Sequence, residues 1–158
     1  MKPIRNSAKA IIIYDGKVLL TKNKDQEGFF YLFPGGGQEH GEQLSDALKR
    51  ECMEEIGCHI RVHDLAYVRE YIGKNHQFAE WDADVHQVEF YFVAELDERI
   101  PPTEQEAQIF AGTNPDEYQV GVEWVALSAL DHIRVYPAQL IPKLQGRGEK
   151  DVYMGDTN

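Results

Sequence analysis

Apolar residues recur along the chain with two different periods, which predict strands arranged around one long helix. Residues 8–14 (AKAIIIY) and 17–21 (KVLLT) are rich in β-forming side chains, and Asp15-Gly16 between them is a strong hairpin signal. Partial or strict alternation and β-rich composition predict further strands at residues 29–33, 60–71, 85–96 and 121–127. We therefore expect a mixed sheet that begins with a hairpin.

Residues 44–56 form the longest helical pattern, because they contain neither Gly nor Pro and are followed by Gly57, a typical helix-ending residue. At about 100° per residue, three apolar side chains of this helix form one stripe: Leu48, Cys52 and Ile56. On the same projection, Glu51 and Glu55 lie within the edge of the apolar stripe, whereas a purely solvated acidic face would lie opposite to it.

This position is unfavourable for two carboxylates unless a cation is present. Glu51 and Glu55 repel each other at i, i+4, and burying an unpaired carboxylate costs several kcal/mol. A hard divalent ion such as Mg²⁺ or Mn²⁺ would bind such oxygen ligands. The alternative is an ordinary solvated face in which Arg50 pairs with Glu54 at i, i+4.

The remaining segments read as connections and short helices. We expect a polar loop at 22–28, short helices at 128–133 and 137–144 with Ser128 as an N-cap, and a flexible polar tail at 146–158. The connection at 73–84 carries two aromatic residues, Phe78 and Trp81. These rings can stack on a base, fill the groove of a partner subunit, or cover the edge of the core.

A second connection, residues 100–118, is acidic and long for a compact domain, which is typical of lids and binding loops. Its acidic residues are Glu104, Glu106, Asp116 and Glu117. An ordinary solvated surface loop is the alternative.

Composition narrows the function further. The chain has 158 residues with 42% hydrophobic content, which fits one globular domain, expected here at residues 1–145. A formal net charge of −11 argues against nucleic-acid binding through the backbone. Two cysteines, without a signal-peptide or membrane-span pattern, lead us to expect a cytoplasmic protein with no membrane partner.

Residues 35–37 are three glycines, the glycine-rich entrance, and together with the helix at 44–56 they carry one specific motif. The spacing is G-x5-E-x7-R-E-x-x-E-E-x-G, filled by Gly36, Glu42, Arg50, Glu51, Glu54, Glu55 and Gly57. This is the pattern of the Nudix box, and the sequence resembles a Nudix hydrolase over about residues 7–145. Seven fixed positions make this match far more specific than a lone glycine motif.

The resemblance implies an α/β (α+β) Nudix fold, a mixed β-sheet sandwiched between α-helices. It further implies hydrolysis, by water attack at phosphorus, of a pyrophosphate bond in a nucleoside diphosphate linked to another moiety, with Mg²⁺ or Mn²⁺ as cofactor. The implied metal ligands are Glu51, Glu54, Glu55 and a carbonyl at Gly35 or Gly36, of which we take Gly36.

Arg50 is expected to orient a glutamate, and the general base is expected to be Glu54 or Glu117. We expect Phe78, Trp81 and Arg69 to contact a small phosphorylated nucleotide. The proline that marks ADP-ribose hydrolysis would fall at Gly73, and the tyrosine that marks dinucleoside polyphosphate hydrolysis would fall at residues 74–76. Both are missing, so no subgroup is assigned.

Two other classes of function stay open. One is a Nudix-fold nucleotide-binding or regulatory module without turnover, although such modules usually have an eroded box. The other is a metal-binding or dimerisation protein that uses Phe78 and Trp81, so a homodimer is also open.

Overall fold

The computed structural model of the protein describes residues 1–97, 110 and 112–158. Nine strands within these residues form one sheet: β1 (Arg5–Tyr14), β2 (Lys17–Asp25), β3 (Gly28–Leu32), β4 (Gly35–Gly37), β5 (Ile60–Ile72), β6 (His86–Leu96), β7 (Gln119–Ala126), β8 (Val135–Tyr136) and β9 (Tyr153–Asp156). The helices are α1 (Leu44–Ile56), α2 (Ala79–Asp82) and α3 (Leu140–Leu144), with the 3₁₀ turns η1 (Gly73–Asn75) and η3 (Leu127–His132).

The sheet is mixed, with β1 at its centre. The main path runs β8-β3-β2-β1-β6-β5-β9, while β4 pairs with β1 and β7 pairs with β2. The β1–β6 pair is parallel, and β1 is antiparallel to both β2 and β4. Asp15 and Gly16 turn the first hairpin with φ angles of 50° and 73°, which confirms the predicted hairpin signal.

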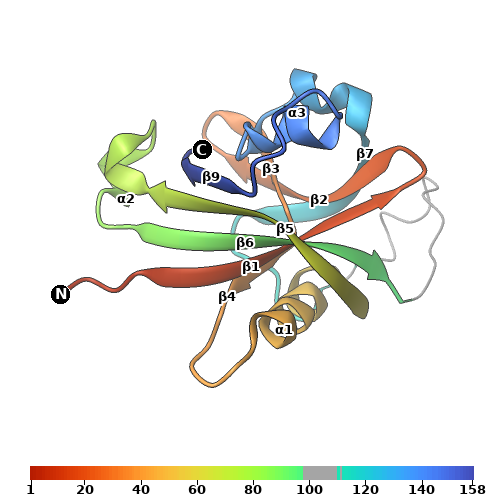
Figure 1. Cartoon of the computed structure of the whole chain (residues 1–158), viewed down its shortest axis with the longest axis horizontal. Coiled ribbons are helices and arrows are strands. Elements are labelled where there is room, and N and C mark those ends of the chain that lie inside the picture. The colour runs from red at the N-terminus through yellow and green to blue at the C-terminus, as the bar shows by residue number, and fades with distance from the viewer. Residues whose placement is uncertain (98–109, 111) are drawn as a thin grey trace.

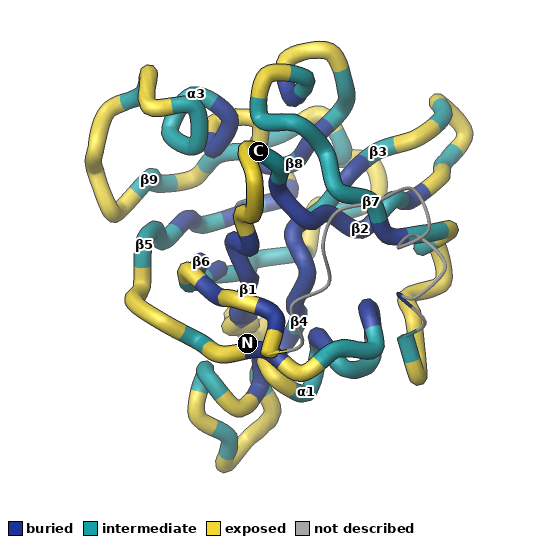
Figure 2. The backbone as a smooth tube through the Cα atoms, turned by 90° about the vertical axis from the view of Figure 1, so that its right-hand side faces the viewer, coloured by how far each residue is buried: buried dark blue, intermediate teal, exposed yellow. Residues whose placement is uncertain are grey.

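Helices cover both faces of this sheet (Figure 1), which confirms the predicted α+β architecture. Alternation along β1 sends Ala8, Ala10 and Ile12 into a core with α1, and sends Ile11 into a second core with η3 and α3. Figure 2 shows the resulting burial of β1 and β2 between the two layers. The short side chains of Ala8 and Ala10 let α1 approach β1 closely.

The predicted helix at residues 44–56 is confirmed with the same bounds. Gly57 ends it in the left-handed conformation, with φ at 69°, and its N–H donates to the carbonyls of Cys52 and Met53. Cys52 and Ile56 are fully buried, so the predicted apolar stripe faces the sheet.

Three predicted boundaries are wrong. The loop at 22–28 is mostly strand, because β2 continues to Asp25 while pairing with both β3 and β7. Ser128 does not cap a helix, since η3 begins after Ala126 without a side-chain cap. The helix predicted at 137–144 begins only at Leu140.

The predicted flexible tail at 146–158 is also contradicted, because strand β9 lies within it and pairs in parallel with β5. Arg69 Nη1 donates to the Thr157 carbonyl at 2.6 Å, which fixes the residues after β9 to the same strand. No helix among the described residues is long and apolar enough to cross a membrane.

Candidate active site

The candidate site lies along the outer edge of β4, the three-glycine strand. In an antiparallel strand, successive residues direct their N–H and C=O groups to opposite sides. The Pro34 carbonyl accepts a hydrogen bond from Ala10 N–H on β1 at 2.8 Å. The N–H and C=O groups of Gly35 therefore point away from β1, and those of Gly36 point towards it. The Gly35 carbonyl, and not that of Gly36, is therefore the one that faces the carboxylates of α1.

Glu55 reaches this edge from α1. Its carboxylate accepts a hydrogen bond from Gly35 N–H at 3.0 Å, and the side chain is only 7% exposed. Burial raises the pKa of Glu55 to about 7, and the charges of Glu51 and Asp116 act in the same direction. Lys9 and the Gly35 N–H oppose this rise without cancelling it, so Glu55 is a buried carboxyl group short of positive charge.

Glu51 lies one turn earlier on α1, against Gly36. A side-chain Cβ at Gly36 would lie 2.5 Å from the Glu51 carboxyl carbon, so a larger residue there would displace this carboxylate. Burial raises the pKa of Glu51, partly opposed by a hydrogen bond from Arg50. Both glutamates at the edge of the apolar stripe are thus partly desolvated, as the helical projection predicts.

Arg50 connects the glycine-rich entrance to the helix. Its guanidinium donates to both Glu42 carboxylate oxygens at 2.9 Å and to the Gly37 carbonyl at 2.9 Å. It also donates to Glu51 at 3.1 Å and approaches Glu54 at 3.5 Å. The predicted Arg50–Glu54 pair is present, but the bidentate pair with Glu42 is shorter and holds the pKa of Glu42 at about 2.

Lys9 reaches the same edge from the other face of the sheet. Its Nζ donates to the Gly35 carbonyl at 3.3 Å, beside the N–H that holds Glu55. Its positive charge lowers the pKa of both Glu51 and Glu55. A lysine between two alanines of an apolar strand is the sequence signal for this residue, and it does not by itself indicate a functional role.

Residues 112–119 hold the C-terminal end of α1, which would otherwise leave carbonyl groups unpaired. Asn114 N–H donates to the Glu54 carbonyl at 2.9 Å, and Gln119 Nε2 donates to the Glu55 carbonyl at 2.8 Å. A Cβ at Gly112 would lie 2.2 Å from the Glu54 carbonyl oxygen, so this backbone packs directly on the helix end. This segment therefore fixes the turn that carries Glu54 and Glu55.

Of the predicted acidic loop, Asp116 and Glu117 are described, and both are exposed. Asp116 is the one whose charge acts on Glu55. Glu117 stays a predicted base, and Glu104 and Glu106 lie outside the described residues.

The predicted metal ligands lie on adjacent turns but do not form a closed cage. Among residues 1–97, 110 and 112–158, no three His, Cys, Asp or Glu side chains converge closely enough to hold an ion. Arg50 instead occupies the space between Glu51 and Glu54. The donor chemistry nevertheless suits a hard cation, because Glu51 and Glu55 are both desolvated carboxylates beside an outward carbonyl.

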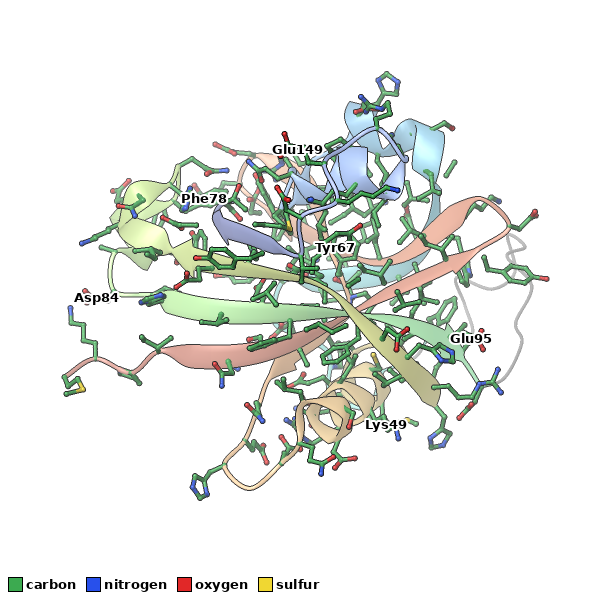
Figure 3. All side chains as sticks on the ribbon, in the orientation of Figure 1. Lys49, Tyr67, Phe78, Asp84, Glu95 and Glu149 are labelled. Carbon is green, nitrogen blue, oxygen red and sulfur yellow. The ribbon has the colours of Figure 1, made fainter. Side chains whose placement is uncertain are left out.

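The three predicted substrate contacts lie elsewhere. Arg69 is 5% exposed, and its guanidinium binds Glu89 at 2.5 Å and the Thr157 carbonyl, so a substrate role would require these bonds to open. Phe78 packs edge-on against Tyr136, with ring centroids 5.5 Å apart, on the opposite side of the sheet from Lys49 of α1 (Figure 3). Trp81 is 77% exposed and free to meet a ligand.

Comparison with known proteins agrees with this architecture. A family model described as the NUDIX domain matches residues 4–144. The nucleoside triphosphatase NudI of Escherichia fergusonii is 46% identical over 50 residues, which cover 30% of this chain and 36% of that protein. This match therefore spans little more than a third of the relative's length.

Solved structures show the same fold at low identity. A NUDIX hydrolase from Nitrosomonas europaea has a TM-score of 0.66 at 17% identity, covering 94% of this chain and 92% of that one. An ADP-ribose pyrophosphatase from Streptococcus suis has a TM-score of 0.60 at 16% identity, covering 98% and 100%. The fold, the complete box and the match of the family model over residues 4–144 together show that this chain belongs to the NUDIX family.

Proposed function

We propose that the protein is a divalent-metal-dependent pyrophosphohydrolase, which cleaves a pyrophosphate bond in a nucleoside diphosphate linked to another moiety. One observation carries this proposal: Glu55 is a buried carboxyl group, short of positive charge, held beside the outward backbone of Gly35. A cation at this edge would offset the cost of ionising Glu55. Because NudI is named a nucleoside triphosphatase, nucleoside triphosphates are the first substrates to test, followed by ADP-ribose.

The residues that would hold Mg²⁺ or Mn²⁺ are Glu51, Glu54 and Glu55, with the Gly35 carbonyl in place of that of Gly36. When bound, the ion lowers the pKa of water and offsets the charge that develops on the leaving phosphate. Arg50 would release Glu51 and Glu54 for this role while its stronger pair with Glu42 keeps the glycine-rich entrance in place.

The attacking water needs a general base, for which Glu54 and Glu117 are the candidates. Residues 112–119 favour a fixed position for Glu54, since they bind the Glu54 and Glu55 carbonyls. The loop would therefore act on catalysis through the position of the helix end, even if Glu117 takes no proton.

The test is phosphate or pyrophosphate release from a panel of nucleoside triphosphates, nucleotide sugars and ADP-ribose, with Mg²⁺, Mn²⁺ or EDTA. We expect metal-dependent turnover of at least one class and a loss of orders of magnitude in Glu55→Gln. Full activity in EDTA contradicts the proposal. Tight nucleotide binding without turnover in any metal would favour the alternative, a regulatory module of the same fold.

A further inference from the structure

Two cationic side chains of β1 flank the candidate site on the face of the sheet away from α1. Arg5 and Lys9 lie four positions apart on β1, an even spacing, so both point to this face, while Ala8 and Ala10 point into the core with α1. At this part of β1, the strand that pairs with it along one edge is β4, whose three residues are all glycine. No side chain of β4 therefore stands between these cations and the outer edge of the strand.

The side chains of Arg5 and Lys9 both extend over β4. A Cβ at Gly37 would lie 2.2 Å from Arg5 Nη2, so the guanidinium lies directly over Gly37. Lys9 Nζ crosses Gly35 to reach its outward carbonyl at 3.3 Å. The absence of side chains on β4 thus shapes a cationic strip, Arg5–Lys9, that ends beside Glu55.

Neither Arg5 nor Lys9 forms an ion pair with any residue that the structure describes. Within the same part of the chain, the Lys9 side chain makes one hydrogen bond, to a carbonyl, and the Arg5 side chain makes none, while Lys22, Arg50 and Arg69 all pair with carboxylates. In a chain with a net charge of −11, two unpaired cations held over backbone are available to an anionic ligand.

Room for such a ligand lies at the Arg5 end of the strip. A groove of about 510 Å³ is lined by residues 3–6 and 38–42, and Arg5 belongs to its wall. Two carboxylates also line this groove: Glu42, whose charge is offset by the bidentate pair with Arg50, and the exposed Glu39, whose Oε1 lies 4.0 Å from Arg50 Nη1. The strip therefore connects the carboxylate edge of β4 to an open groove.

We propose that the Arg5–Lys9 strip binds the phosphate chain of the substrate, with Lys9 on the phosphate beside Glu55 and Arg5 on the phosphate farthest from it. Arg5 and Lys9 lie four positions apart, so their α-carbons are roughly 13 Å apart. Because both side chains are long, their charged ends can approach the same polyphosphate. The Arg5 guanidinium suits a terminal phosphate, which offers a pair of acceptor oxygens. This assignment rests on the proposed nucleotide substrate. It names the residues whose contacts would distinguish substrates by their number of phosphates.

The test measures binding without turnover, using α,β-methylene-ATP and α,β-methylene-ADP as probes in calorimetric titrations with Mg²⁺ and with EDTA. We expect Lys9→Met to raise Kd about tenfold for both probes, and Lys9→Arg to restore most of the loss. Arg5→Met should raise Kd about tenfold for the triphosphate and much less for the diphosphate. Lys49→Met, at an exposed position of α1, removes the same charge and should leave Kd within about twofold.

The proposal that the strip binds phosphate is refuted if Lys9→Met and Arg5→Met keep wild-type melting temperatures and Kd values within twofold of wild type. An equal loss of affinity in Lys49→Met would show that only net charge matters, and it would refute the proposal as well. The proposed function fails separately: wild-type protein that binds both probes through Lys9 and Arg5 but hydrolyses no nucleotide would keep the strip and refute the enzyme. Absence of binding by the wild type would refute both.

Discussion

Replacing Glu55 with Gln should stabilise the metal-free protein at neutral pH, although it removes a residue expected to be essential for turnover. Glu55 is 7% exposed, and burial raises its pKa from an ordinary 4.5 to about 7. Since one pH unit corresponds to about 1.4 kcal/mol, ionising Glu55 in the folded protein costs about 3 kcal/mol more than in the unfolded chain. Gln keeps an oxygen that can accept the Gly35 N–H but has no charge to bury.

The sign of the pH dependence follows from the raised pKa. Below pH 4.5, Glu55 is protonated in both states and contributes no penalty; between pH 4.5 and 7, the unfolded chain loses the proton first and the folded state loses stability. Above pH 7 the penalty is complete. Glu55→Gln should therefore equal wild type near pH 4.5 and exceed its free energy of unfolding by about 3 kcal/mol at pH 8, in EDTA.

Urea unfolding at the two pH values measures this difference directly. Glu149→Gln, at an exposed carboxylate, serves as the control and should show no pH-dependent difference from wild type. Addition of Mg²⁺ at pH 8 should stabilise the wild type and leave Glu55→Gln unchanged. A difference between Glu55→Gln and wild type that is the same at pH 4.5 and pH 8 would refute the account of Glu55 as an uncompensated buried acid.

The other predictions concern the surroundings of Glu55. Arg50→Ala should lower kcat more than it raises KM, because Arg50 positions carboxylates; steady-state kinetics showing only a raised KM would make it a phosphate ligand. One of the two variants Glu54→Gln and Glu117→Gln should lose the acidic limb of the pH–kcat profile, and the other should keep it. Wild-type profiles in both variants would exclude both residues as the base. Gly112→Ala should cost about 1–3 kcal/mol in urea unfolding, because the methyl group meets the backbone at the end of α1. Gly121→Ala, which has open space, is its control, and an equal cost in both variants would contradict the docking of residues 112–119.

Three local features of this protein were readable from its sequence. The helix at 44–56 follows from an uninterrupted helical pattern ended by Gly57, and the first hairpin follows from Asp15-Gly16, because each signal lies within the segment it specifies. The placement of Glu55 at the edge of the apolar stripe followed from helix geometry alone.

Features that depend on pairing between distant segments were not readable. Strand β9 has only four residues, too few to show an alternating pattern, and it forms because β5 offers it an edge. The role of Lys9 depends on the β1–β4 pairing, which places its side chain over Gly35. The preference for the Gly35 carbonyl over that of Gly36 likewise depends on which side of β4 faces β1.

The central claim is that the carboxylates of α1 at the outer edge of β4 hold a divalent ion. Titration of the protein with Mn²⁺, followed by the electron paramagnetic resonance signal of the free ion, tests this most directly. We expect saturable binding by the wild type and by Glu149→Gln, and at least tenfold weaker binding by Glu55→Gln. Equal Mn²⁺ affinity in wild type and Glu55→Gln would contradict the claim.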